Sequence, residues 1–198
     1  KTSILSDISV TLAEGLTNSP KAGEVLRSLY LVRHFIERRD EPELWYRYHP
    51  LFRDFLLERL AARYSVDEVR NLRRQAAIRL AEVGQYEESI VQLRQAEDWT
   101  AMAGQIIALA PAVLGQGRLA TVDEWISAIP KHVLEGNPWL RFWHACSRLA
   151  RDPHDAHTMF EQVFEQFVAQ KDQTGTFLAW TNVVRCIFFE WRGLPRLD

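Results

Sequence analysis

Four basic residues have the spacing of a binding surface on a helix. They recur every three or four positions, so on an α-helix they would share one face: Arg141, His144, Arg148 and Arg151. Guanidinium and imidazolium groups bind carboxylates and phosphates. This basic ridge therefore indicates a groove for an anionic small molecule or for the acidic surface of a partner protein. The alternative is an ordinary solvated helix face.

Two further patterns suggest ligands but have simpler explanations. Asp152, His154, Asp155 and His157 are metal-ligand types, yet acidic groups in the first turn of a helix also cap its amides and favour its dipole. Residues 115–120, GQGRLA, match a dinucleotide-binding pattern. No strand precedes them, and a turn between helices accounts for both glycines. We therefore predict neither a metal site nor a dinucleotide site.

No motif in the sequence predicts catalysis. There is no P-loop, no Gly-x-Ser-x-Gly and no His-Glu-x-x-His pattern. Cys146 and Cys186 lie in apolar, helix-like stretches without metal spacing, so we expect reduced core thiols in a cytoplasm. The chain is expected not to be an enzyme and to bind no cofactor by itself.

The composition excludes two classes of protein. The net charge of −2 argues against a protein that coats duplex DNA, because phosphate binding needs a concentrated basic surface. No apolar run approaches the roughly 20 residues of a membrane-spanning helix, and no signal peptide opens the chain. With 198 residues, 47% of them hydrophobic, the chain is long enough for one or two cytoplasmic domains.

The elements that would position the ridge are paired helices. After Ser65 apolar residues recur with helical periodicity, and turns centre on Gly84, Gly117, Asp152 and Gly193. These turns recur every 33 to 41 residues, which is typical of a tetratricopeptide-like solenoid. We predict a tetratricopeptide-like helical-hairpin solenoid over residues 65–198. An irregular helical bundle is the alternative.

Local signals place the helix ends. Residues 65–68 and 121–124 both have the pattern of a capping box. Pro111 is expected to bend or end one helix, and Pro130 to close another. Pro138 and Pro153 suit the first turns of two more.

The last predicted helix, residues 176–191, is apolar on nearly all sides. Such a helix should not face water, so we expect the repeat region to be truncated and further helices of a longer protein to cover it. The isolated chain is expected to self-associate or to bind a hydrophobic dye through this end.

The region before Ser65 has a different pattern. A helix opens at Ser19-Pro20, and two strands with a turn at Pro42 follow, in HFIERRD and WYRYH. Pro50 then starts a helix with Arg53 on its solvent face and an apolar face that would be buried: Leu51, Phe52, Phe55, Leu56 and Leu60. Helices followed by a hairpin predict a partial winged-helix module over residues 1–64. The predicted fold class is mainly α.

Three segments resemble a known family. KTSIL at the start, WYRYHPLFRDFLLERL at 45–60 and LRRQAAIRLAEVGQYEESIVQLRQAEDW at 72–99 resemble the middle of MalT-type, LuxR-family transcriptional regulators. These are ATP-dependent proteins of the STAND class. The resemblance implies a nucleotide-binding domain before this region, a sensor that continues after it, and a C-terminal DNA-binding helix-turn-helix. ATP or ADP would then be a cofactor, and DNA a partner, of the full-length protein only.

The resemblance also implies a role for His49. In STAND proteins a winged-helix histidine within a Met-His-Asp motif contacts the phosphate of bound ADP and holds the closed state. Here Tyr48-His49-Pro50 occupies that place. The histidine matches, while the methionine and the aspartate do not. An imidazole can donate to a phosphate oxygen; the alternative is that His49 bonds to local backbone.

These observations predict a regulatory, signal-sensing fragment of a transcriptional regulator. It would bind an inducer or a regulatory protein and bias the closed-to-open equilibrium of the ATPase domain. The alternative is a free-standing helical-repeat scaffold for protein–protein interactions. A P-loop upstream and a helix-turn-helix downstream would select the first reading, whereas start and stop codons at the two ends would select the second.

Overall fold

The computed structural model describes residues 1–32, 35–39 and 44–192, with side chains to residue 187. They divide into two compact units, Lys1–Asp98 and Trp99–Asp198. Most described residues are helical, and a small three-stranded sheet lies near the N-terminus. The mainly α fold class, with a winged-helix module followed by helical hairpins, is confirmed.

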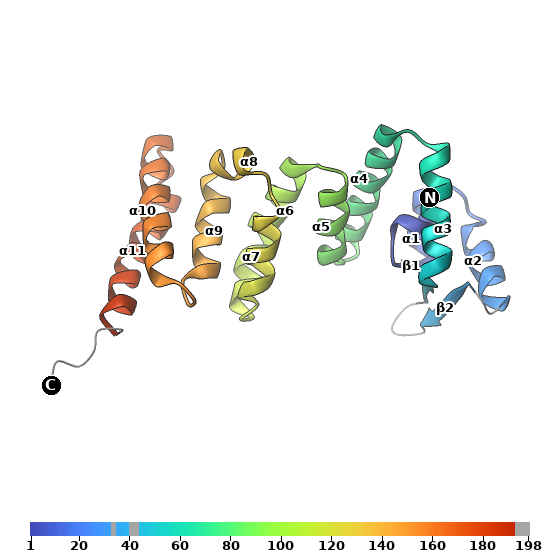
Figure 1. The fold of residues 1–198 in the computed structure, drawn as a ribbon, viewed down its shortest axis with the longest axis horizontal. Helices are drawn as coiled ribbons and strands as arrows, with labels where there is room; N and C mark the ends of the chain where they lie inside the picture. Colours follow the sequence, from blue (N-terminus) through green and yellow to red (C-terminus); the bar gives the residue numbers. More distant parts are fainter. Residues whose placement is uncertain (33–34, 40–43, 193–198) are drawn as a thin grey trace. The chain divides into compact units, whose positions relative to one another are not determined.

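The first unit begins with the winged-helix module (Figure 1). After a short 3-10 turn at Thr2–Ile4, its elements are β1 (Asp7–Ser9), α1 (Val10–Thr17), α2 (Ala22–Leu31), β2 (Ile36–Arg39), β3 (Trp45–Tyr48) and α3 (Pro50–Arg63). β3 is the central strand and pairs antiparallel with both neighbours. The hairpin of β2 and β3 was predicted, whereas β1 and α1 were not. The predicted turn at Pro42 lies outside the described residues.

One hydrophobic core joins this module to the first helical hairpin. The hairpin consists of α4 (Val66–Glu82) and α5 (Tyr86–Gln95). The sheet, the N-terminal helices and α4 contribute side chains to the same cluster, among them Ile4, Ile8, Leu12, Tyr46, Leu72, Ala76 and Leu80. Because α4 shares this core, the compact unit extends to Asp98. The domain boundary that the sequence predicted between residues 64 and 65 stays a prediction.

The predicted start and end of α4 are confirmed. The Ser65 hydroxyl accepts from the Glu68 amide at 3.3 Å, and the Glu68 carboxylate accepts from the Ser65 amide at 2.8 Å. Gly84 follows the helix with φ of +77°, a conformation that favours glycine. The turn into α5 therefore lies where the sequence predicted it.

The prediction for α3 was partly wrong. Leu51 and Phe55 are exposed, because α3 has a narrower buried face than its apolar residues suggest. Arg53 does not point freely into solvent: its guanidinium donates to the backbone carbonyls of Ser3 and Ile4 at 3.0 and 3.1 Å. The long side chain thereby ties the N-terminal segment to α3.

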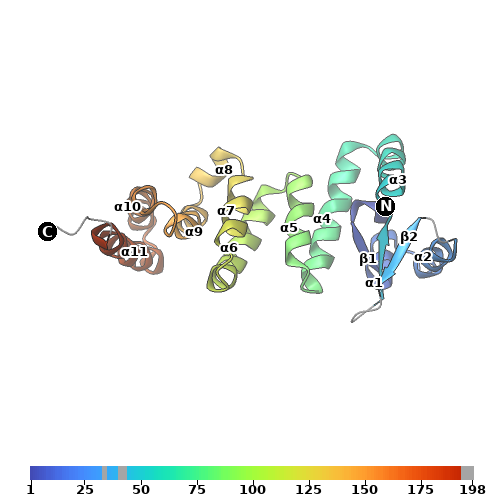
Figure 2. The same cartoon turned by 60° about the horizontal axis from the view of Figure 1, so that its bottom comes forward.

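The second unit consists of packed helical hairpins. Its helices are α6 (Trp99–Gly115), α7 (Leu119–Ser127), α8 (Lys131–Glu135), α9 (Pro138–Arg148), α10 (Pro153–Gln170) and α11 (Gln173–Arg192). α7 packs on α6 and α9, α9 packs on α10, and α10 packs on α11. Figure 2 shows α10 and α11 lying side by side. The turns at Gly117 and Asp152 are confirmed, while Gly193 lies outside the described residues.

One local prediction for the second unit was wrong. Residues 121–124 form no capping box, because the left-handed Gly117 (φ of +77°) turns the chain early enough for α7 to begin at Leu119. Pro111 lies inside α6 and does not end it, so of the two predicted effects only the bend stays a prediction. α7 ends at Ser127, three residues before Pro130, which is the N-cap of α8, a helix that was not predicted.

Aromatic rings fill the core of α9, α10 and α11. Phe142, Phe160 and Phe167 are buried, and the ring centroids of Phe167 and Trp139 lie 5.0 Å apart. A Cβ atom at Gly175 would lie 2.3 Å from the Phe167 ring. The close approach of α11 to α10 therefore requires glycine at this position.

Candidate functional site

His49 lies at the junction between β3 and α3. It is the N-cap of α3, its amide donates to the Phe35 carbonyl at 2.8 Å, and its carbonyl accepts from the Arg53 amide at 2.9 Å. The residue is exposed, and its side chain makes no capping hydrogen bond. The local bonds thus use the main chain and leave the imidazole accessible to a group that approaches this corner.

Three of the four ridge residues converge on Asp123 of α7. Its Oδ1 accepts from Arg148 Nε at 2.9 Å and lies 3.1 Å from His144 Nε2. Its Oδ2 lies 3.5 Å from the Arg151 guanidinium. Arg148 also donates to Asp155 at 3.3 Å. The ridge is therefore part of an ion cluster that ties α7 to α9 and to the first turn of α10.

Burial and neighbouring charges set the protonation states in this cluster. Burial alone would raise the pKa of Asp123, but the hydrogen bond from Arg148 and the nearby positive charges outweigh it and lower that pKa. Burial, followed by the charge of Arg148, lowers the pKa of His144 despite the opposing effect of Asp123. Asp123 is thus ionised and His144 neutral at pH 7.

The cluster changes what the ridge offers to a ligand. His144 is only 7% exposed, and Arg148 is already paired with Asp123. Arg141 donates a hydrogen bond to Gln162 of α10. An anionic ligand would have to compete with Asp123 for Arg148, so Arg141 and Arg151 are the more accessible cations. A binding role for Arg141, His144 and Arg148 stays a prediction.

The protonation of His144 should make stability depend on pH. In the unfolded chain its pKa returns to about 6.5, whereas the folded pKa is lower. Below about pH 6.5 the unfolded state therefore binds more protons, and the stability present at higher pH is lost as the pH falls through the folded pKa. We expect urea unfolding between about pH 7.5 and pH 5 to show this loss.

The matched variants for this prediction are His144→Gln and His132→Gln. His132 is exposed on α8, so its replacement should leave the pH dependence as it is in the wild type. His144→Gln should flatten the pH dependence. If the unfolding free energy of His144→Gln depends on pH as steeply as that of the wild type, His144 is not the titrating group.

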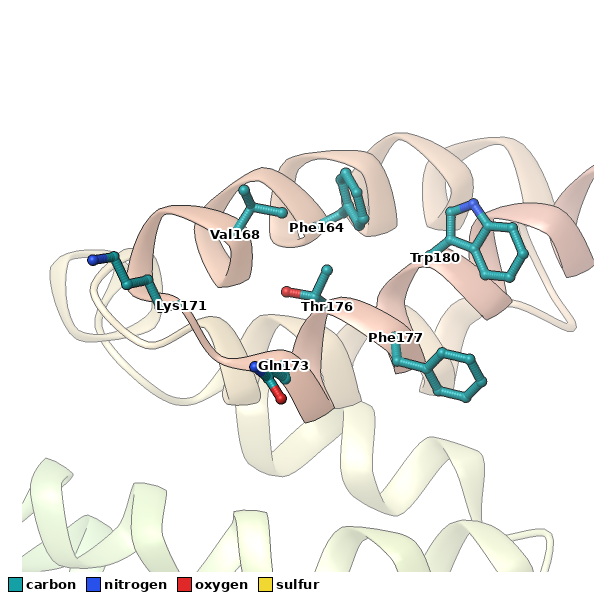
Figure 3. A pocket seen from close by; sticks show the side chains of 7 residues that line it. All are labelled: Phe164, Val168, Lys171, Gln173, Thr176, Phe177 and Trp180. Carbon is teal, nitrogen blue, oxygen red and sulfur yellow. The ribbon is translucent and has the colours of Figure 1, made fainter.

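An apolar groove of about 640 Å³ lies between α10 and α11 (Figure 3). It is lined by Phe164, Val168, Lys171, Gln173, Thr176, Phe177 and Trp180. Phe177 and Trp180 are 65% and 53% exposed. Exposed apolar surface of this kind is typical of an interaction face. This groove is part of the surface that further helices of a longer protein were predicted to cover. That covering, and the self-association predicted for the isolated chain, stay predictions.

The other sequence candidates have structural roles. Asp152 caps α10, since its side chain accepts from the Asp155 amide at 3.0 Å. Within residues 1–32, 35–39 and 44–192, no group of three or more His, Cys, Asp or Glu is arranged to hold a metal ion. Gly115 ends α6, and Gly117 forms the turn that follows it. No helix in the described part of the chain is long and apolar enough to cross a bilayer.

Comparison with known families places the first part of the chain. Residues 1–68 match the family model of the MalT winged helix domain. The match contains the His49 corner and all three strands of the sheet, and it ends at the capping box that opens α4.

Curated relatives extend this similarity beyond residues 1–68. The chain is 27% identical over 172 residues to the HTH-type transcriptional regulator MalT of Serratia proteamaculans (strain 568), covering 85% of this chain and 19% of that protein. Two proteins of the same name, from Yersinia pestis (strain Pestoides F) and Yersinia pseudotuberculosis (serotype O:1b, strain IP 31758), are each 27% identical to the chain over 163 residues. Each match covers 81% of this chain and 18% of the relative.

The resemblance to MalT-type regulators is thereby confirmed, and the relatives are named as transcriptional regulators. The chain spans about a fifth of the length of these relatives. No solved structure matches it.

Sequence reasoning missed the role of Asp123. It was assigned to a capping box, whereas it is the acceptor at the centre of the ion cluster. Its partner Arg148 lies 25 positions further along the chain, so local spacing carries no signal of the pairing. Only the packing of α7 against α9 brings the two side chains together.

Proposed function

We propose that this chain is the regulatory part of a transcriptional regulator, with the MalT-type domain next to helical hairpins that sense a signal. The observation that carries the proposal is the match of residues 1–68 to the MalT winged helix domain. Two features support it: the similarity to regulators named MalT along 81–85% of the chain, and the helical hairpins that follow the matched domain.

In the proposed switch, an inducer or a regulatory protein binds to the helical hairpins. Binding biases the closed-to-open equilibrium of an ATPase domain elsewhere in the full-length protein, through contacts that differ between the two states. ATP or ADP is the cofactor of that domain, and DNA is contacted through a further domain. The chain itself performs no catalysis in this scheme, and the switch operates in the cytoplasm.

His49 has the part of a nucleotide sensor in this scheme. Its exposure and its place at the start of α3 allow the imidazole to donate to a phosphate on an adjoining domain. A hydrogen bond to a charged phosphate contributes about 1.5–3 kcal/mol. We therefore expect His49→Ala in the full-length protein to speed ADP dissociation by about tenfold or more.

The experiment follows the release of a fluorescent ADP analogue by stopped flow. His132→Ala is the matched control, because His132 is also exposed but lies in the second unit, on α8. Its release rate should equal that of the wild type. Equal rates for His49→Ala and the wild type would remove the nucleotide role of His49 and leave it as part of the β3–α3 junction.

The exposed groove between α10 and α11 favours the scaffold as the second candidate. A free-standing scaffold would bind a partner protein through this surface without regard to nucleotide. The regulator instead predicts that binding of a partner or inducer changes with the bound nucleotide. The affinity of the full-length protein for its partner or inducer, measured once with ADP bound and once with ATP bound, separates the two candidates. Equal affinities favour the scaffold, and different affinities favour the regulator.

A further inference from the structure

A second cavity lies inside the helical unit Trp99–Asp198 and has a volume of about 430 Å³. It is lined by α6, α7, α9 and α11 together with the turn after α9: Leu114, Leu119, Phe142, Trp143, Cys146, Leu149, Ala150, Leu178, Asn182 and Arg185. Cavities of about 300–1,000 Å³ hold small organic molecules in proteins. This cavity is therefore large enough for a compact ligand.

The apolar wall of the cavity is held in place by packing. Trp143 contacts Phe142 edge to face at a centroid distance of 4.9 Å and stacks on Trp139 at 6.4 Å. Leu149 is buried, and Leu178 packs against the same aromatic core. Because these side chains are fixed by their neighbours, the wall is formed before any ligand arrives.

Two polar side chains on α11 line the cavity. Asn182 and Arg185 lie three positions apart on α11, so they share a face of the helix. The Asn182 amide donates to the Leu178 carbonyl at 2.9 Å. Burial raises the pKa of the Cys146 thiol to about 12, so this wall residue stays uncharged and brings no negative charge near Arg185.

We propose that this cavity binds a small organic anion with an apolar body, whose carboxylate pairs with Arg185 and whose body packs against Phe142, Trp143 and Leu178. The inference rests on the proposed function for its biological meaning, since it names the class of inducer that the helical unit would take. The binding itself follows from the cavity and requires no nucleotide-binding domain.

The test uses octanoate as the probe, with 1-octanol and octylamine as matched compounds of similar chain length. Binding to the 198-residue chain is measured by calorimetry, without nucleotide or DNA. Octanoate should bind more tightly than octanol, and octylamine should bind most weakly. Arg185→Gln should weaken octanoate about fivefold and leave octanol unchanged. Arg185 is exposed, so this change should not impair folding.

Two variants locate the site. Leu178→Trp fills the cavity and should abolish octanoate binding in a chain whose circular dichroism is unchanged. Trp180→Ala alters the neighbouring groove between α10 and α11 and should leave binding intact. Loss of binding in Trp180→Ala, or equal affinity for octanoate and octanol in the wild type, would overturn the proposal. Neither result bears on ADP release from His49→Ala, so the two proposals fail separately.

Discussion

Replacement of Phe167 by alanine is expected to lower the free energy of unfolding by about 3–5 kcal/mol. The Phe167 side chain is fully buried, packs on Trp139 and lies against the backbone at Gly175. The surrounding helices are expected to close only part of the space that the ring leaves, so the variant loses both the transfer free energy of the ring and contacts around the remaining cavity. We regard this ring as the main link between α10 and its two neighbours.

Phe177→Ala is the matched control for this prediction. It removes the same side chain from the same helical hairpin, but Phe177 is 65% exposed. Its unfolding free energy should stay within about 0.5 kcal/mol of the wild type. Urea unfolding followed by circular dichroism measures both variants. Similar losses in the two would mean that the packing between α10 and α11 differs from the arrangement described above.

Asp123→Ala is expected to cost about 2–3 kcal/mol. The change removes the carboxylate nearest to Arg148. It also leaves the positive charges of Arg148 and Arg151 without the negative charge that both now contact. The Asp123 side chain is 20% exposed, so solvent replaces only part of what is lost. Asp123→Asn retains an acceptor without the charge and should give an intermediate loss.

Glu124→Ala is the control for the ion cluster. Glu124 is the next residue on α7 and is exposed, so its removal should change the unfolding free energy by about 0.5 kcal/mol or less. The same unfolding experiment measures all three variants. A loss for Asp123→Ala as small as that for Glu124→Ala would show that the cluster is a solvated surface feature and does not hold α7 to α9.

The helices could be predicted because their signals are local. Apolar residues repeat with helical period, Ser65 and Glu68 form a capping box across one turn, and Pro138 and Pro153 occupy first turns. Each of these patterns depends on residues a few positions apart. The helical hairpins and the β2–β3 hairpin therefore lie where the sequence placed them.

The features that were missed depend on contacts between distant residues. β1 has three residues and becomes a strand only by pairing with β3, where Ile8 lies opposite Tyr46. Arg53 reaches carbonyls 49 and 50 positions earlier in the chain. Of the candidate site, the sequence placed His49 at a strand–helix junction and Arg141, His144 and Arg148 on one helix, whereas Arg151 lies in the turn after α9. It could not reveal Asp123 as the counter-ion of Arg148 and Arg151.

The nucleotide content of the native gene product gives the most direct test of a nucleotide-controlled regulator. The protein is purified from its own cells, denatured and assayed for released ATP and ADP, and its mass is measured. We expect a stoichiometric adenine nucleotide on a polypeptide much heavier than the 23.0 kDa of this chain. A nucleotide-free product of about 23.0 kDa would contradict the regulator and leave the helical-repeat scaffold.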